Sequence, residues 1–227
     1  MFCVKDMPLQ ADPEFIALCL QTDTATIGHR LQDGFLDRNI RPVLGTGTIV
    51  GTAITLCLPA QDATLIHYAA GKMRPGDVLI IDRGGNDHFA CIGGTVAVAL
   101  QVAGCIGAIV DGPITDPDEL KEVGFPVWSR GISAITCRNQ GLGGSMNVPI
   151  SCGGVVVNPG DVVFADNCGV VVLREKETQE NVEWAVEFSS NDRKNWERVR
   201  NGEKIADISG ATELVEANMS ETSQIST

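Results

Sequence analysis

The sequence predicts an α/β protein in which buried parallel strands alternate with covering helices. Residues 78–81 and 107–110 form continuous apolar runs, which are typical of strands buried on both faces. Helical patterns follow them at residues 94–103 and 117–123. Aromatic residues make up only 5% of a chain that is 44% hydrophobic. The core must therefore be built from aliphatic side chains, which suits a sheet covered by helices.

Upstream of these runs, residues 13–34 are expected to be helical. Asp12 can cap this segment, and Gly34 can end it. Thr22 or Asp23 can divide it into two helices, because both residue types favour caps over helix interiors.

Four further elements complete the predicted alternation. Residues 47–58, rich in Thr, Ile, Val and Leu, predict a strand. Asp62 is expected to cap a helix that runs to about residue 72. Residues 125–128 and 133–138 are expected to be strands.

The last third of the chain changes in character. Residues 149–173 are rich in strand formers punctuated by Gly and Pro, whereas residues 175–200 are charged and periodic, which predicts an exposed helix. Residues 210–227 predict a frayed polar tail. No linker is visible, so residues 1–227 are expected to form one domain with its core at about residues 20–180.

The charge balance limits the classes of partner. The formal net charge is −12, and such a surface repels nucleic-acid backbones and anionic membranes. We therefore expect no direct nucleic-acid or membrane partner. An anionic substrate would need a local positive site, such as a helix N-terminus, a metal ion or an arginine.

The chain contains 8 cysteines, none of them in a CxxC pair, and most lie in apolar stretches. This distribution favours buried free thiols in a reducing compartment over a disulfide framework or a zinc site. Neither a signal peptide nor an apolar run of membrane-spanning length can be recognised. We therefore expect a cytoplasmic protein.

A glycine-rich loop precedes the helix predicted at residues 94–103. Gly84 and Gly85, then Gly93 and Gly94, separate this helix from a buried strand. Exposed N–H groups and the helix dipole can hold a carboxylate or a phosphate there without a basic side chain. Glycines also serve close packing, and the pattern by itself leaves the two interpretations equal.

Several carboxylates follow the next strand. Asp111, Asp116 and Glu119 lie near the end of that strand and the start of the helix at residues 117–123. Carboxylates in this position can hold a hard divalent cation. Asp116 can also cap the helix, because Pro117 follows at a first-turn position. Without other context, capping is the favoured interpretation.

A known family shares this order of motifs. The matching segments lie at residues 82–94, 104–112, 116–120, 125–131, 153–155, 159–161 and 166–170. Over about residues 20–180 the chain resembles the family of regulator of ribonuclease activity A and class II 4-hydroxy-4-methyl-2-oxoglutarate aldolases. The resemblance implies a swivelling α/β/β/α sandwich of phosphohistidine-domain-like topology, assembled as a homotrimer or hexamer.

The resemblance also implies a site. Active aldolases of this family carry an acidic residue, twenty intervening residues, then Arg-Asp, and a second acidic residue three positions later. By this pattern Asp116 holds a divalent metal, Mg²⁺ or Mn²⁺, and Glu119 is the trailing acid. The implied amide donors for the substrate carboxylate are those of Gly93, Gly94, Thr95 and Val96.

Two positions depart from the family pattern. Gly94 stands where the first acid is expected, and Thr115 stands where the arginine is expected. Losing a charged hydrogen bond of ~1.5–3 kcal/mol would cost one to two decades in affinity. Asp87 and His88 in the preceding loop could supply a carboxylate and a base, and Arg83 could reach the anion.

The resemblance thus implies a metal-dependent lyase acting on a small 2-oxo acid. Its substrate would be 4-hydroxy-4-methyl-2-oxoglutarate or oxaloacetate, and its product pyruvate. A cation on Asp116 would act as Lewis acid, while an ordered water or His88 moves the proton.

Two other functions remain open. The departures at Gly94 and Thr115 also fit a non-enzymatic regulator that docks on a ribonuclease. His88 after Gly84 and Gly85 gives a weaker match to a phosphohistidine carrier. The remaining histidines, such as His67, are expected to be packing or surface residues, because no ligand lies at metal spacing from them.

Overall fold

The computed structural model describes all residues except 45–46, 60 and 223–227. The described chain divides into two compact units, Met1–Ala185 and Val186–Thr227, and each is considered by itself. The expectation of one domain over residues 1–227 stays a prediction. All the candidate site residues lie in the first unit.

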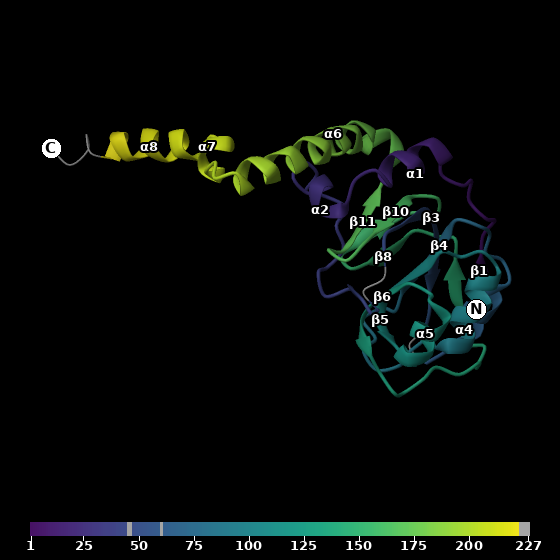
Figure 1. Ribbon diagram of the computed structural model, residues 1–227. Helices are drawn as coiled ribbons and strands as arrows, with labels where there is room; N and C mark the ends of the chain where they lie inside the picture. Colours follow the sequence, from purple (N-terminus) through teal and green to yellow (C-terminus); the bar gives the residue numbers. More distant parts are fainter. Residues whose placement is uncertain (45–46, 60, 223–227) are drawn as a thin grey trace. The chain divides into compact units, whose positions relative to one another are not determined.

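Four parallel strands form the centre of the first unit. They are β3 (Ile49–Cys57), β4 (Asp77–Asp82), β5 (Gly107–Ile114) and β6 (Val127–Ile132), which pair in that order. Figure 1 shows β4, β5 and β6 in the middle of this unit, with α4 and α5 next to them. The pairing brings the carboxyl ends of β4 and β5 to the same edge, where Asp82 is the register partner of Asp111.

Shorter strands extend the sheet on both sides. The sheet order is β1-β7-β3-β4-β5-β6-β2, and β3 also pairs with β10, which pairs with β11. The bounds of these strands are β1 (Phe2–Val4), β2 (Arg41–Pro42), β7 (Gly144–Met146), β10 (Val162–Ala165) and β11 (Val170–Leu173). A separate hairpin consists of β8 (Ile150–Cys152) and β9 (Val155–Val157).

Three short helices connect the parallel strands. They are α3 (Thr64–Ala70), α4 (Gly94–Val102) and α5 (Pro117–Val123), and all three contribute buried side chains to one core cluster. The strands alternate between this cluster and a second one, because successive side chains point to opposite faces of a sheet. In β4, Leu79 and Ile81 join the first cluster, whereas Val78 and Ile80 join the second.

The second cluster lies under the β8–β9 hairpin and the loop that contains Leu36 and Ile40. Trp128 is fully buried in it and donates its indole N–H to the carbonyl of Asp166 at 2.8 Å. A third cluster joins α1 (Pro13–Cys19) and α2 (Thr24–Ile27) to β10 and β11. The sheet is therefore covered on both faces, as its apolar strands predict.

The C-terminal unit is helical. Helix α6 (Glu175–Arg200) begins in the first unit and continues into the second, where α7 (Ile205–Ile208) and α8 (Ala211–Thr222) follow. Within the described residues, no helix combines the length and the apolar character that crossing a bilayer would require.

Most of the predicted elements are confirmed. The segment 13–34 divides into two helices, with Asp12 and Asp23 as their N-caps, and each carboxylate accepts a backbone N–H of the first turn. The predicted end at Gly34 is wrong, because α2 already ends at Ile27. The helices predicted at residues 117–123 and 175–200 have the predicted bounds.

Two predictions about the later chain are wrong. Residues 133–138 form no strand and make only single bridges, Ala90 with Thr136 and Asp62 with Arg138, because they pair with two different loops. Residues 210–227 are not a frayed tail throughout, since α8 covers Ala211–Thr222. Residues 223–227 of the predicted tail lie outside the described residues.

Candidate functional site

A polar cavity of about 350 Å³ lies beyond the ends of β4 and β5. Three segments enclose it: the start of α4, the turn after β5, and residues 136–137. Helix α3 contributes one side. The lining residues are Ala63, His67, Ala90, Cys91, Ile92, Gly93, Gly94, Thr95, Val96, Thr115, Asp116, Thr136 and Cys137. In sheets of this type ligands bind at the carboxyl ends of the strands, so the cavity is the candidate site.

Asp116 lines the cavity and occupies the N-cap position of α5, but its side chain does not cap the helix. It has the left-handed backbone conformation, φ 54° and ψ 51°, at the start of α5, and its side chain accepts no capping hydrogen bond. The carboxylate turns toward α4 instead, with Oδ2 at 3.4 Å from the Gly94 amide nitrogen. Thr115 donates its hydroxyl to Oδ1 at 3.0 Å. The capping interpretation of Asp116 is therefore wrong.

The backbone fixes this turn against the start of α4. The Thr115 amide donates to the Ile92 carbonyl at 2.9 Å. Gly93 is the N-cap of α4 and has no side chain to satisfy the first turn. The first N–H groups of an α-helix lack acceptors within the helix. Gly94, Thr95 and Val96 belong to this first turn and line the cavity, so their backbone N–H groups are available there as donors. The predicted amide donors and Asp116 are thus brought together.

The two glycines at this helix start lie close to the carboxylates of Asp116 and Glu119. A Cβ on Gly93 would overlap the Asp116 Oδ2 atom, and one on Gly94 would overlap the Glu119 Oε2 atom. The Glu119 carboxylate therefore occupies the space into which a side chain at position 94 would project. Glu119 is exposed and does not line the cavity, so it lies beside the predicted site instead of inside it.

Arg83 lies behind the cavity wall. Its side chain is 1% exposed, and its Nη2 donates to the Phe89 carbonyl at 3.1 Å and to Cys137 Sγ at 3.3 Å. Desolvation raises the pKa of the Cys91 and Cys137 thiols, and the Arg83 charge opposes that rise. Arg83 does not line the cavity, so its guanidinium cannot contact a ligand there directly. Its positive charge can act on such a ligand only at a distance, across the residues that line the cavity.

Asp87 and His88 are exposed loop residues outside the cavity lining. The His88 carbonyl accepts the Ser133 hydroxyl at 2.6 Å, and its backbone N–H donates to Asn86. The structure does not bring either side chain together with Asp116. Asp87 and His88 lie in a tight loop that the Asn86 side chain closes by hydrogen bonds to the backbone of Phe89. The residues that line the cavity begin only after this loop, at Ala90.

His67 lines the cavity, although the sequence predicts a packing or surface residue there. Its Nδ1 lies 3.3 Å from Asn139 Nδ2, which is a hydrogen-bond distance. One sequence signal points to this residue. Helix α3 follows β3, which is parallel to β4, so its start lies at the same edge of the sheet as Gly93.

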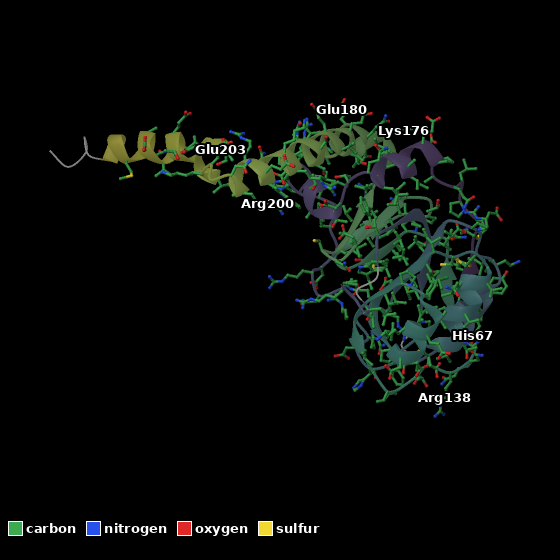
Figure 2. The ribbon with its side chains drawn as sticks, viewed as in Figure 1. His67, Arg138, Lys176, Glu180, Arg200 and Glu203 are labelled. Carbon is green, nitrogen blue, oxygen red and sulfur yellow. The ribbon has the colours of Figure 1, made fainter. Side chains whose placement is uncertain are left out.

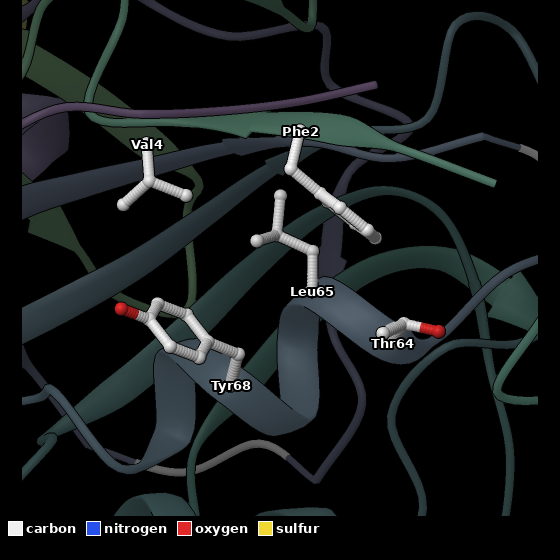
Figure 3. A pocket seen from close by; sticks show the side chains of 5 residues that line it. All are labelled: Phe2, Val4, Thr64, Leu65 and Tyr68. Atoms are coloured by element: carbon white, nitrogen blue, oxygen red, sulfur yellow. The ribbon is translucent and has the colours of Figure 1, made fainter. Parts of the chain in front are cut away.

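A second cavity, of about 220 Å³, differs in chemistry. Figure 3 shows Phe2 and Val4 of β1 facing Leu65 and Tyr68 of α3 across it. Thr64 supplies the remaining wall. Apart from the hydroxyl groups, the lining is apolar and carries no charge, so this cavity is unsuited to a carboxylate or a cation.

Comparison with known proteins identifies the relatives of this site. A family model described as "RraA-like: Aldolase/RraA" matches residues 23–172. The chain belongs to the RraA-like family. The resemblance predicted from the sequence is confirmed, and the match includes every residue that lines the polar cavity.

One relative in sequence is named as an aldolase. A protein of Halalkalibacterium halodurans named "Putative 4-hydroxy-4-methyl-2-oxoglutarate aldolase" is 35% identical over 175 residues, which cover 76% of this chain and 82% of that protein. Its name refers to a lyase.

Two solved RraA structures have the same fold. RraAS2 of Streptomyces coelicolor, described as an unusual member of the RNase ES inhibitor RraA family, is 26% identical with a TM-score of 0.71, over 88% of this chain and 100% of that one. The RNA-processing inhibitor RraA of Thermus thermophilis is 27% identical with a TM-score of 0.60, over 66% of this chain and 91% of that one. The mixed α/β architecture is thereby confirmed.

Proposed function

We propose that this RraA-like chain is a divalent-metal-dependent lyase that cleaves a small 2-oxo acid and releases pyruvate. The candidate substrates are 4-hydroxy-4-methyl-2-oxoglutarate and oxaloacetate. The relative named as an aldolase supports this reaction class. The proposal depends mainly on one observation: the Asp116 carboxylate makes no helix cap and instead faces the amide of Gly94 in a polar cavity.

The residues present fit a hard cation of the Mg²⁺ or Mn²⁺ type. Among the described residues, no three His, Cys, Asp or Glu side chains converge in a way that would enclose a metal ion. Mg²⁺ usually keeps several waters and binds protein through one or two carboxylates. We propose Asp116 as the metal ligand, because it lines the cavity, whereas Glu119 lies beside Gly94 without lining it.

Each protein group has a proposed task. A bound cation would act as Lewis acid at the 2-oxo group. The amides of Gly94, Thr95 and Val96 hold the substrate carboxylate with the help of the helix dipole. Thr115 contributes a hydroxyl in place of the family arginine and keeps the Asp116 carboxylate in position through their hydrogen bond.

We propose His67, in place of His88, as the residue that moves a proton. His67 lines the cavity and is oriented by Asn139, whereas His88 lies outside. A neutral imidazole can accept the proton released from the 4-hydroxyl group of 4-hydroxy-4-methyl-2-oxoglutarate when the carbon–carbon bond breaks. The resulting imidazolium can return that proton to the enolate to give pyruvate. Asp87 has no role in this proposal, because its side chain does not line the cavity.

Replacing Asp116 tests the proposal. Purified protein with Mg²⁺ or Mn²⁺ should release pyruvate from oxaloacetate or 4-hydroxy-4-methyl-2-oxoglutarate, measured by coupling to lactate dehydrogenase. Asp116→Asn should lower this rate at least 100-fold, because it removes the anionic ligand. The matched control is Asp118→Asn, which removes the same charge from the first turn of α5 outside the cavity. Equal rates in the two variants would refute the site.

A second function has its own support. Thr115 replaces the arginine of the aldolase pattern, and the solved relatives are described as inhibitors of RNA processing. A regulator that docks on a ribonuclease needs no metal. Capture of one stoichiometric ribonuclease by the wild type and by Asp116→Asn alike, without pyruvate release, would favour the regulator.

The finer structural expectations belong to the same proposal. We propose that the fold is the swivelling α/β/β/α sandwich of phosphohistidine-domain-like topology and that the chain assembles as a homotrimer or hexamer. Sedimentation equilibrium of the full chain measures the assembly directly. A cytoplasmic location without a membrane partner remains part of the proposal.

A further inference from the structure

Strand β1 forms one edge of the main sheet. It pairs only with β7, so within the described residues no strand lies along its other side. All three of its residues, Phe2, Cys3 and Val4, are exposed. A strand edge in this position presents N–H and C=O groups that can pair with a strand of another molecule.

The hydrogen bonds to β7 show which backbone groups of β1 point outward. The carbonyl of Met1 accepts an N–H of β7, and the N–H of Lys5 donates to a carbonyl of β7. Hydrogen-bonding groups alternate in direction along a strand, so Cys3, midway between these two residues, also faces β7. The N–H and C=O groups of Phe2 and Val4 therefore point away from the sheet.

The residues of β1 lack the usual protection of a sheet edge. Native proteins blunt such edges with lysine, proline or a β-bulge. The strand reads Phe-Cys-Val, and its register with β7 runs without a shift. Lys5 and Asp6 follow only after the strand and carry opposite charges. In a chain of net charge −12, this uncharged edge is a place where two copies can approach with little electrostatic repulsion.

The side chains of Phe2 and Val4 add an apolar surface beside this edge. Across the cavity of about 220 Å³ they face Leu65 and Tyr68 of α3 (Figure 3). Leu65 is 2% exposed, whereas Phe2, Val4 and Tyr68 are 41%, 44% and 49% exposed. The cavity therefore has a buried apolar floor and an exposed apolar rim. Exposed apolar side chains that gather beside a free strand edge indicate an interaction site.

The charged helix α6 begins in another part of the first unit. Figure 2 shows Lys176 and Glu180 of α6 at one end of this unit and His67 of α3 toward the other. Lys72 lies beside the rim of the cavity, with its Nζ 5.5 Å from the centroid of the Tyr68 ring. Pairing at β1, which faces α3 across the cavity, therefore uses a surface away from the charged residues of α6.

We propose that β1 pairs with β1 of a second copy of this chain, antiparallel, about a two-fold axis that passes between the two Cys3 residues. Phe2 then exchanges hydrogen bonds with Val4 of the partner subunit, because the outward groups of both residues lie at equal distances from Cys3. The same register places the Phe2 ring beside Val4 of the partner subunit, and aromatic–β-branched pairs are favourable across antiparallel strands. The inference goes beyond the proposed function and does not depend on it.

In this register the two Cys3 residues lie opposite each other. They form a non-hydrogen-bonded pair, in which the Cα atoms of antiparallel strands lie about 4.5 Å apart. A disulfide requires Cα atoms about 4.4–6.8 Å apart, so an oxidant can join the two thiols. A two-fold contact cannot build a trimer and instead joins two assemblies, such as two trimers into a hexamer. Because three residues from each copy make a small contact, the association is weak and depends on concentration.

The test joins the two Cys3 residues in the full chain with diamide, which takes up the two thiol hydrogens as the disulfide forms. The wild type should give a covalent dimer on a non-reducing gel, with a Cys3-to-Cys3 peptide in the mass spectrum. Cys3→Ser should abolish this dimer, whereas Cys168→Ser, which removes the other exposed cysteine, should keep it. Val4→Pro should lower the yield roughly fivefold or more, because proline removes the outward N–H but no bond to β7. The matched control is Val4→Thr, which keeps both the N–H and the β-branched shape.

Sedimentation equilibrium of the wild type and Val4→Pro gives a second readout without an oxidant. The mass of the wild-type assembly should double as the concentration rises, while Val4→Pro keeps the lower mass. Equal cross-linking yields in Val4→Pro and Val4→Thr would overturn the inference, because the cross-link would then come from random collision. A single mass at every concentration, without a Cys3 cross-link, would also overturn it and leave this edge to a strand of a different protein.

Discussion

At the scale of single residues, the pair Gly94 and Glu119 explains how the site departs from the family pattern. The missing acid at position 94 does not leave empty space, because the Glu119 carboxylate lies there. The sequence reveals the substitution but not this occupancy, since the direction of a side chain from α5 depends on how α4 and α5 pack. Asp116 illustrates the same limit. Its place at the start of α5 is predictable from the sequence, whereas its left-handed backbone conformation and the missing capping hydrogen bond of its side chain are not.

Restoring an acid at position 94 should therefore destabilise the protein. Gly94→Asp should lower the free energy of unfolding by about 1–3 kcal/mol in urea titration, because the new side chain overlaps Glu119. Adding Glu119→Ala should recover the part of that loss caused by the carboxylate, whereas the Cβ of residue 119, at 2.9 Å from the new Cβ, remains. Glu119→Ala alone serves as the control. Additive losses in the double variant would show that the two side chains do not compete for one space.

At the scale of elements, the segment after β6 shows what local pattern cannot reveal. Residues 133–138 have the composition of a strand but pair with one loop at Ala90 and another at Asp62. Residues 136–137 therefore line the polar cavity instead of extending the sheet as a further strand. The sequence predicts Asp62 as the cap of α3, but the N-cap is Ala63, one residue later. The Asp62 carboxylate still accepts the N–H of Thr64, the first residue of α3, at 2.9 Å. Its bonds to Gln140 and Leu142, far along the chain, become visible only in the fold.

Asp62 should therefore stabilise this segment in a pH-dependent way. Desolvation raises the pKa of Asp62, but hydrogen bonds from Gln140, Thr64 and Leu142 outweigh it and hold the pKa below its usual value. Asp62→Asn should cost roughly 2–4 kcal/mol at neutral pH, because an amide NH₂ would face backbone donors. A carboxyl group whose pKa is lowered in the folded state stabilises the folded protein at pH values above its unfolded-state pKa of ~4. This contribution to the free energy of unfolding is lost as the pH falls below that value toward the folded-state pKa.

The measurement is thermal or urea unfolding of the wild type and Asp62→Asn between neutral pH and about pH 3. The difference in unfolding free energy should shrink below about pH 4. A difference that stays constant across this range would show that the Asp62 charge does not support the loop. Asp118→Asn, an exposed change on α5, provides the reference for general acid effects.

At the scale of the whole molecule, the alternation of strands and helices is predictable because buried aliphatic strands and helical periodicity are local properties. The edge at which β4 and β5 end is predictable as well, since parallel strands share the direction of their carboxyl ends. What the sequence does not reveal is which loops close over that edge. His67 comes from the last turn of α3 and lines the cavity, although the sequence alone predicts a packing or surface residue there.

The most direct test of the site is a crystal structure of the full chain with Mn²⁺ and oxalate. The account predicts an anomalous peak beside the Asp116 carboxylate and an oxalate oxygen within hydrogen-bond distance of the amides that open α4. An empty cavity at saturating Mn²⁺ and oxalate, or metal bound elsewhere with Asp116 turned back to cap α5, would contradict it.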